Sequence, residues 1–191
     1  MLSADGTEGA IRQKMIERGL VEAIVILPRN LFYSTDISVT LWILNANKKA
    51  RVINRNGEEI HYRDREKEIL FIDMRQMGEP FEKKYVRFTD EDIRKVADTY
   101  HNWQREGRTD TYADIPEFCK SVKIDEEGGI ANKGFSLVPS KYIEFVNRDE
   151  AVDYDTRMKQ LQAELSEILK QETESRNAVL NVFKSLGYEI N

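Results

Sequence analysis

Residue types that commonly perform catalysis or bind metals occur in this sequence, but not at the spacings that such chemistry needs. Cys119 is the single cysteine, and the two histidines, His61 and His101, are scattered. One cysteine excludes an internal disulfide and favours a reducing compartment, and no zinc-type ligand cluster can form. There is no glycine-rich phosphate or cofactor loop and no nucleophile elbow, and carboxylates occur in runs such as DEE and TDED, which are typical of solvated surfaces and helix caps. We therefore expect no catalytic, cofactor-binding or metal-binding residue in this chain.

Two aromatic residues occupy an unusual position in the stretch PRNLFYSTDISVTLWIL, residues 28–44. Phe32 and Tyr33 lie in a connection between two strand-like runs, where polar turn residues are usual. From the residues alone, the favoured explanation is that both rings cover the edge of a sheet. The strands on either side of this loop determine what the two rings can contact.

The first 76 residues predict an α/β arrangement that begins with a helix over residues 8–18. Three strand-like runs follow: the nearly continuous apolar residues 21–28, the alternating residues 37–44 and the apolar residues 68–74. Asn56-Gly57 is a strong signal for a two-residue turn, so residues 51–62 are expected to form an exposed hairpin. A helix, a buried strand, a loop and another strand make an α/β pattern.

Residues 77–147 predict a helical and irregular extension. Thr89 and Asp92 have the spacing of a capping box, which predicts a helix that runs to about Arg105. Pro116 suits the first turn of a short helix in PEFCKS. The later run FSLVPSKYIEFV is apolar and interrupted by proline, so it is expected to be extended and packed.

Residues 148–191 predict one long C-terminal helix, because residues 154–186 contain neither proline nor glycine and Gly187 follows as a stop. Apolar residues recur alternately three and four apart, with polar breaks at Glu172 and Ser175. The apolar stripe consists of Met158, Leu161, Leu165, Ile168, Val179, Val182 and Leu186, and Leu169 and Phe183 widen it. A helix of about thirty residues is roughly 45 Å long, more than a domain of this size can cover. Part of the stripe is expected to face another chain, with an antiparallel pairing inside the chain or a crystal-driven dimer as the alternative.

The bulk composition is that of a globular protein with a large solvated surface. The chain has 191 residues, of which 40% are hydrophobic and 33% charged, and its formal net charge is -5. A nucleic-acid binder that acts alone is more often basic, so another chain or segment would supply positive surface near DNA. No apolar run is long enough to span a bilayer, and the N-terminus does not have the pattern of a signal peptide. A cytoplasmic protein without a membrane partner is expected.

Several segments together resemble one family. EGAIRQKMIERGLVEAIVILPRNLFYSTDISVTLWILN is similar to the downstream half of the methyltransferase domain in the modification (M) subunits of type I restriction-modification systems. ILFIDMR, a capping-box helix ending VADTYHNW, IPEFCKSV and GFSLVPSKYIEFV resemble segments that follow in the same order there. The resemblance covers most of residues 7–146 and continues into the terminal helix. Asn56-Gly57 and Gly128-Gly129 depart locally from the family pattern.

The resemblance implies a fold and an activity. Residues 1–76 would be the C-terminal part of a Rossmann-like methyltransferase sheet, and the parent protein would be an adenine-N6 DNA methyltransferase that uses S-adenosylmethionine. The cofactor glycines and the Asn-Pro-Pro-aromatic motif of the family would lie upstream, and none of the four prolines here is paired. This chain alone is therefore expected to bind no cofactor and to be inactive.

The resemblance also implies roles for the loop and the helix. Phe32 matches the aromatic that packs against the flipped-out adenine, which needs a π-face to replace its lost stacking, whereas Tyr33 is expected to be structural. The apolar stripe would dock on the specificity (S) subunit, in a complex that also holds a restriction subunit and contacts DNA. Without the S subunit, the chain would self-associate or the distal turns of the helix would be mobile.

A second hypothesis from another class is a non-catalytic helical adaptor for protein–protein assembly. An in-frame upstream cofactor loop and Asn-Pro-Pro-aromatic motif would distinguish the M subunit from this adaptor, for which Met1 would be a natural start. The sequence does not give the DNA recognition site, whether restriction accompanies methylation, or the oligomeric state.

Overall fold

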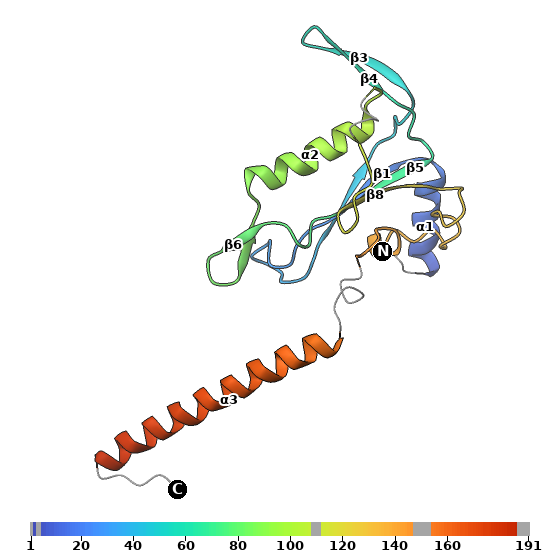
Figure 1. The fold of residues 1–191 in the computed structure, drawn as a ribbon. Coiled ribbons are helices and arrows are strands. Elements are labelled where there is room, and N and C mark those ends of the chain that lie inside the picture. The colour runs from blue at the N-terminus through green and yellow to red at the C-terminus, as the bar shows by residue number, and fades with distance from the viewer. Residues whose placement is uncertain (1, 3–4, 108–111, 147–153, 187–191) are drawn as a thin grey trace. The chain divides into compact units, whose positions relative to one another are not determined.

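The computed structural model describes residues 2, 5–107, 112–146 and 154–186 (Figure 1). The chain divides into two compact units, Met1–Val146 and Asn147–Asn191. The finer division that we expected at residue 76 stays a prediction. Each unit is described by itself below.

A four-stranded mixed sheet forms the centre of the first unit. Its strands are β1 (Val21–Ile26), β2 (Thr40–Leu44), β5 (Glu68–Asp73) and β8 (Cys119–Lys123), in the order β2-β1-β5-β8. The central strands β1 and β5 are parallel, whereas β2 and β8 are antiparallel to their neighbours. Because β1 and β5 are covered on both faces, their sequences are almost continuously apolar, as predicted. The expected α/β class is confirmed.

Two helices cover opposite faces of this sheet. α1 (Gly6–Glu17) contributes Ile16 to one core cluster, together with Ile24 and Phe71. α2 (Asp90–Gln104) contributes Trp103 to the second cluster, with the strand residues that alternate with those of the first. α2 begins with the predicted capping box, in which Thr89 Oγ1 accepts from Asp92 N at 3.1 Å and Thr89 N donates to Asp92 Oδ2 at 2.9 Å.

Two hairpins extend from the sheet. β3 (Arg51–Arg55) and β4 (Glu58–Tyr62) form the predicted hairpin, with Asn56 and Gly57 both at positive φ, as a two-residue type I′ turn requires. The second hairpin, β6 (Glu79–Phe81) and β7 (Tyr85–Arg87), was not expected from the sequence.

Three expectations for individual segments need correction. The second strand begins at Thr40, not at residue 37. The prediction of a short helix in PEFCKS is wrong, because Cys119 begins β8, which pairs with the edge of β5. This pairing satisfies backbone groups of β5 that a helix at this position would leave unpaired. Residues 77–147 are thus not only helical and irregular. The FSLVPSKYIEFV run is not fully extended either, since it contains the 3₁₀ turn η1 (Pro139–Lys141) beside the buried Tyr142 and Ile143.

The second unit contains one long helix, α3 (Tyr154–Ser185). All its side chains that the structure describes are exposed. The beginning of the expected helical range, residues 148–153, and the expected stop at Gly187 lie outside the described residues. None of the helices that the structure describes combines the length and the apolar character needed to cross a membrane.

Candidate functional site

A cavity of about 530 Å³ lies where the two parallel strands end. β1 and β5 run in the same direction, and Met74 N donates to Ile26 O at 2.8 Å, which joins the chain leaving β5 to the end of β1. In open α/β sheets, ligands commonly bind outside the carboxyl ends of the strands. The cavity is lined by Pro28, Arg29, Asn30, Ser38, Arg75, Gln76, Met77, Gly78, Pro80 and Val86.

The loop between β1 and β2 supplies one wall of this cavity and also carries the two aromatic residues. A tight turn is closed by Thr35 N, which donates to Phe32 O at 3.4 Å. Leu31 packs against the core cluster on the α2 side, which anchors the loop just before the turn. Val86 N donates to Asn30 O at 3.1 Å and so fastens the loop to the β6–β7 hairpin. The turn is therefore held from both ends.

The structure places the two aromatic rings differently. Tyr33 packs edge-on against Tyr85 of β7, with ring centroids 4.5 Å apart, so it braces the loop against the hairpin. Phe32 is 41% exposed, and no ring contact involves it among the described residues. Only Phe32 of this pair thus presents a ring without an aromatic neighbour.

Two arginines that sequence reasoning missed line the same cavity. Arg29 is exposed, and its Nε donates to Asp36 O at 3.1 Å. Arg75 is ion-paired with the buried Asp73, with Nη2 and Oδ2 2.6 Å apart, and the hydrogen bonds that Arg75 donates to Asp73 raise the pKa of Arg75. A signal was present in the sequence: LPR and IDMR each place an arginine directly after an apolar strand.

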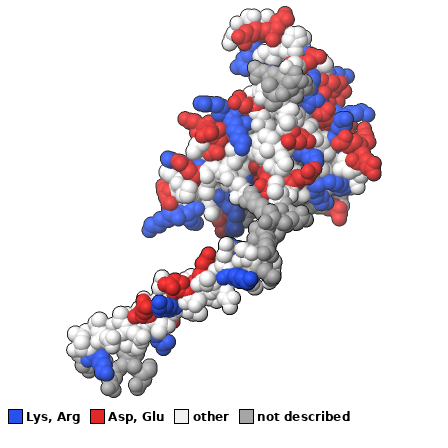
Figure 2. Space-filling view, viewed as in Figure 1, with Lys and Arg blue, Asp and Glu red and all other residues white. Residues whose placement is uncertain are grey.

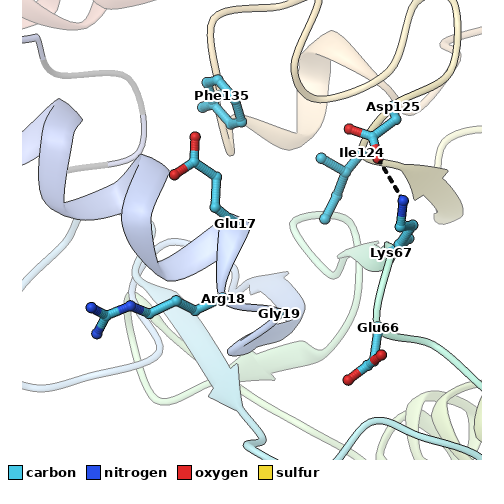
Figure 3. Close-up of a pocket in the computed structure, with 8 residues that line it drawn as sticks. All are labelled: Glu17, Arg18, Gly19, Glu66, Lys67, Ile124, Asp125 and Phe135. Atoms are coloured by element: carbon cyan, nitrogen blue, oxygen red, sulfur yellow. Dashed lines mark hydrogen bonds and ion pairs between the residues drawn. The ribbon is translucent and has the colours of Figure 1, made fainter.

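A second cavity, of about 390 Å³, lies at the other end of the parallel strands (Figure 3). Gly19 and Lys67, which line it, come just before β1 and β5. Its lysine is paired, since Lys67 Nζ lies 3.2 Å from Asp125 Oδ2, and Arg18 extends away from the other labelled charges (Figure 3). The cavity at the carboxyl ends is the stronger candidate, because it places two arginines at the sheet edge that usually binds ligands, and only Arg75 of the two has an ion-pair partner among the described residues.

A buried polar cluster holds the sheet to α2 and to the base of the β3–β4 hairpin. The Glu22 carboxylate of β1 accepts hydrogen bonds from Arg65 Nε and Gln104 Nε2, each at 3.1 Å, and from Tyr100 OH at 3.0 Å and Asn45 Nδ2 at 2.7 Å. Burial raises the pKa of Glu22, but these hydrogen bonds and the charge of Arg65 outweigh burial and lower the pKa below its ordinary value. These groups serve the structure of the unit, and Arg65 Nη2 has no hydrogen-bond partner among the described residues.

The single cysteine and the possible metal ligands do not form a further reactive site among the described residues. Burial raises the pKa of the Cys119 thiol, so this buried cysteine is poorly suited to act as a nucleophile. Within the residues that the structure describes, no group of three or more His, Cys, Asp or Glu side chains is placed to hold a metal.

The predicted partner-interface residues all lie on or at the end of α3. Met158, Leu161, Leu165, Ile168, Val179, Val182 and Leu186 are between 44% and 65% exposed. They keep the three-and-four spacing on one continuous helix. The apolar stripe is therefore available on this unit.

The comparisons with known proteins show the family. Residues 1–151 match the N-6 DNA methylase family, and the chain belongs to it. It is 37% identical over 190 residues to the type I restriction enzyme HindI methylase subunit of Haemophilus influenzae, covering 99% of this chain and 38% of that protein. It is 28% identical over 187 residues to the type I restriction enzyme MjaIX methylase subunit of Methanocaldococcus jannaschii, covering 98% of this chain and 30% of that protein. The resemblance to type I modification subunits is confirmed.

A solved structure shares the fold. The type I restriction-modification system methyltransferase subunit from Streptococcus thermophilus aligns with a TM-score of 0.57 and 24% identity, over 75% of this chain and 24% of that one. The chain thus spans well under half the length of the curated relatives and of this structure.

Proposed function

We propose that this chain is the C-terminal portion of the M subunit of a type I DNA adenine-N6 methyltransferase. The observation that carries this proposal is the 37% identity to a methylase subunit over 99% of the chain, together with the family match over residues 1–151. In the parent protein, S-adenosylmethionine supplies the methyl group that adenine N6 accepts, and N6 gives up a proton. The parts that bind the cofactor and perform the transfer belong to the rest of the parent protein, so the chain alone is inactive.

Within this activity, Phe32 stacks on the flipped-out adenine. Its support is the exposed ring on a loop that Leu31 and the Asn30–Val86 hydrogen bond hold in place at the carboxyl ends of β1 and β5. A fixed aromatic face can replace the base stacking that is lost when a nucleotide leaves the duplex. The sheet would thus be the C-terminal part of a Rossmann-like methyltransferase sheet that presents this loop.

The test compares three substitutions of Phe32 in the complete protein, assembled with its specificity subunit. Phe32→Ala and Phe32→Leu should both weaken adenine methylation by about 1–3 kcal/mol of transition-state stabilisation, because both remove the stacking face. Phe32→Tyr should retain it. If Leu supports methylation as well as Phe does, the ring only covers apolar surface and the stacking role is wrong. Saturable binding of S-adenosylmethionine by this chain alone, measured by calorimetry, would contradict the proposal that the cofactor-binding parts belong to the rest of the parent protein.

α3 serves subunit assembly in this proposal. Its apolar stripe docks on the helices of the specificity subunit, and the complete complex adds a restriction subunit and contacts DNA. The support is a 32-residue helix whose described side chains are all exposed. An isolated helix gains little stability from propensity alone, so this stripe needs a cover. Without the specificity subunit, we expect the chain to self-associate through the stripe.

A further inference from the structure

The cavity at the carboxyl ends of β1 and β5 is lined by cationic and neutral polar side chains. Its charged lining residues are two arginines, Arg29 and Arg75, and no carboxylate lines it among the described residues. Amide and hydroxyl groups come from Asn30, Gln76 and Ser38. Arg, Asn, Gln and Ser are among the side chains that contact nucleic-acid phosphates. The lining therefore favours an anion with several oxygens.

The two arginines have different local partners. Arg75 is oriented by Asp73, to which its Nε donates at 3.0 Å and its Nη2 at 2.6 Å. No hydrogen bond from Arg75 Nη1 is present among the described residues, and the guanidinium carbon lies 5.9 Å from the centroid of the Phe145 ring. Arg29 bonds a backbone carbonyl rather than a carboxylate, which leaves its charge without an ion-pair partner in the described part of the chain. Two carboxylates close to the lining have partners of their own: Glu79 is paired with Arg87 at 2.6 Å, and Asp92 accepts hydrogen bonds from Thr89.

The cavity has a rigid wall on the hairpin side. Gly78 has φ +93, and a Cβ at this position would lie 2.5 Å from Val86 Cγ1 and 3.0 Å from Arg87 O. Only glycine allows the chain leaving β5 to approach β7 this closely. With the hydrogen bond from Val86 N to Asn30 O, this contact fixes both loops that carry the arginines.

We propose that this cavity binds a backbone phosphate of the DNA strand that carries the flipped adenine, with Arg29 and Arg75 as its cationic contacts. The inference rests on the proposed function. Arg29 and Phe32 are three residues apart, so their Cα atoms are at most about 10 Å from each other, which is the scale of one nucleotide from base to phosphate. The guanidinium fork matches phosphate oxygens. On the face of the first unit that Figure 2 shows, basic and acidic side chains are interspersed, which favours a discrete phosphate site over a broad basic surface on that face.

The experiment measures binding of a short fluorescent single-stranded DNA oligonucleotide to this chain by anisotropy at several salt concentrations. Arg29→Gln should lower the salt slope of the affinity by about 0.7, the value for one lost phosphate contact on a single strand. Arg29→Lys should retain the slope. Arg75→Lys keeps a cation beside Asp73, so that the fold is preserved, but it loses the planar fork and should weaken binding roughly tenfold. Arg55→Gln, at the exposed end of β3, is the matched control and should change neither quantity.

Three results would overturn the proposal: no saturable binding, an Arg29→Gln variant that behaves as Arg55→Gln does, or competition by inorganic phosphate or adenosine monophosphate as strong as that by the oligonucleotide. The last result would assign the cavity to a free anion. The anisotropy does not depend on methyl transfer. If it fails while Phe32→Ala still lowers methylation by the parent protein, the phosphate site alone is wrong; if the parent does not methylate adenine, the proposed function is wrong.

Discussion

Glu22 is the position at which a single substitution should most clearly test how the first unit is held together. The residue lies in β1, is 1% exposed, and receives four hydrogen bonds on its two carboxylate oxygens. Glu22→Gln keeps the size of the side chain but replaces one of these oxygens by an amide nitrogen, which cannot accept. Two of the four donors thus lose their acceptor, and Arg65 keeps its buried charge without a counterion.

The expected loss in the free energy of unfolding is about 3–5 kcal/mol. A buried donor left without its acceptor costs about 1–3 kcal/mol, so two donors account for most of this loss. Removing one partner of a buried ion pair falls in the same range. Because a domain is stable by only about 5–15 kcal/mol, the substitution should remove a large part of the stability of this unit.

Denaturant unfolding followed by tryptophan fluorescence measures this loss selectively. The chain has two tryptophans, Trp42 and Trp103, and both lie in the first unit. Glu58→Gln, on the exposed strand β4, is the matched control and should change stability by less than about 0.5 kcal/mol. If Glu22→Gln loses no more than this control, the cluster does not stabilise the fold. Replacing both members of the pair, with Arg65→Met added to Glu22→Gln, should recover part of the loss.

The same variant has a defined pH dependence. The pKa of Glu22 lies below its ordinary value of 4.5, so the ionised group stabilises the folded state above the unfolded pKa. This stability is lost as the pH falls through the folded pKa, because the folded protein must then take up a proton. The difference in free energy of unfolding between wild type and Glu22→Gln should therefore be constant above about pH 5.5 and shrink below pH 4.5. A difference that does not change with pH would show that Glu22 does not act through its charge.

Two further substitutions test the hairpin wall and the apolar stripe. Gly78→Ala should lower the free energy of unfolding by about 1–3 kcal/mol in the same assay, because the added Cβ would overlap Val86. Gly57→Ala is the control: its added Cβ would meet no atom within 4 Å, so this variant carries only the cost of a positive φ. Equal losses would show that the close approach at Gly78 does not matter. Leu165→Asp in the complete M subunit should reduce co-purification with the specificity subunit, since a charge would enter an apolar interface at a cost of several kcal/mol. Asn177→Asp places the same charge elsewhere on α3, and equal co-purification of both variants would refute the assignment of the interface.

The sequence predicts those elements whose signals are local. β1 and β5 are apolar along their whole length because they are buried on both faces, and the Thr89–Asp92 capping box and the Asn56-Gly57 turn each determine their geometry within a few residues. The sequence did not predict β8, because the signal for this strand is not local. Its strand character comes from pairing with β5, and neither its own alternation nor Pro116 before it indicates a strand.

The candidate site shows the same limit. Phe32 could be singled out because an aromatic residue in a loop is conspicuous by its type alone. Arg29 and Arg75 could not be joined into one site from the sequence, because they come together only through the parallel pairing of β1 and β5. An arginine after each of two apolar strands becomes informative once the strands are known to run in the same direction, since their carboxyl ends then share an edge.

The two ends of β1 therefore have separable roles. At its start, Glu22 is enclosed by donors from α2 and from the base of the β3–β4 hairpin, and this end determines stability. Beyond its other end, Arg29 is exposed beside an open cavity, and this end is suited to binding. About 13 Å of strand separates Glu22 from Ile26, where β1 ends. At such a separation the effects of substitutions usually add. Glu22→Gln should thus lower the free energy of unfolding and leave the salt slope of oligonucleotide binding by the folded protein unchanged. Arg29→Gln should lower the salt slope and leave the free energy of unfolding unchanged. The double variant should show both effects in full. If Glu22→Gln altered the salt slope, the polar cluster would be coupled to the cavity, and stability and binding would not be independent functions of this strand.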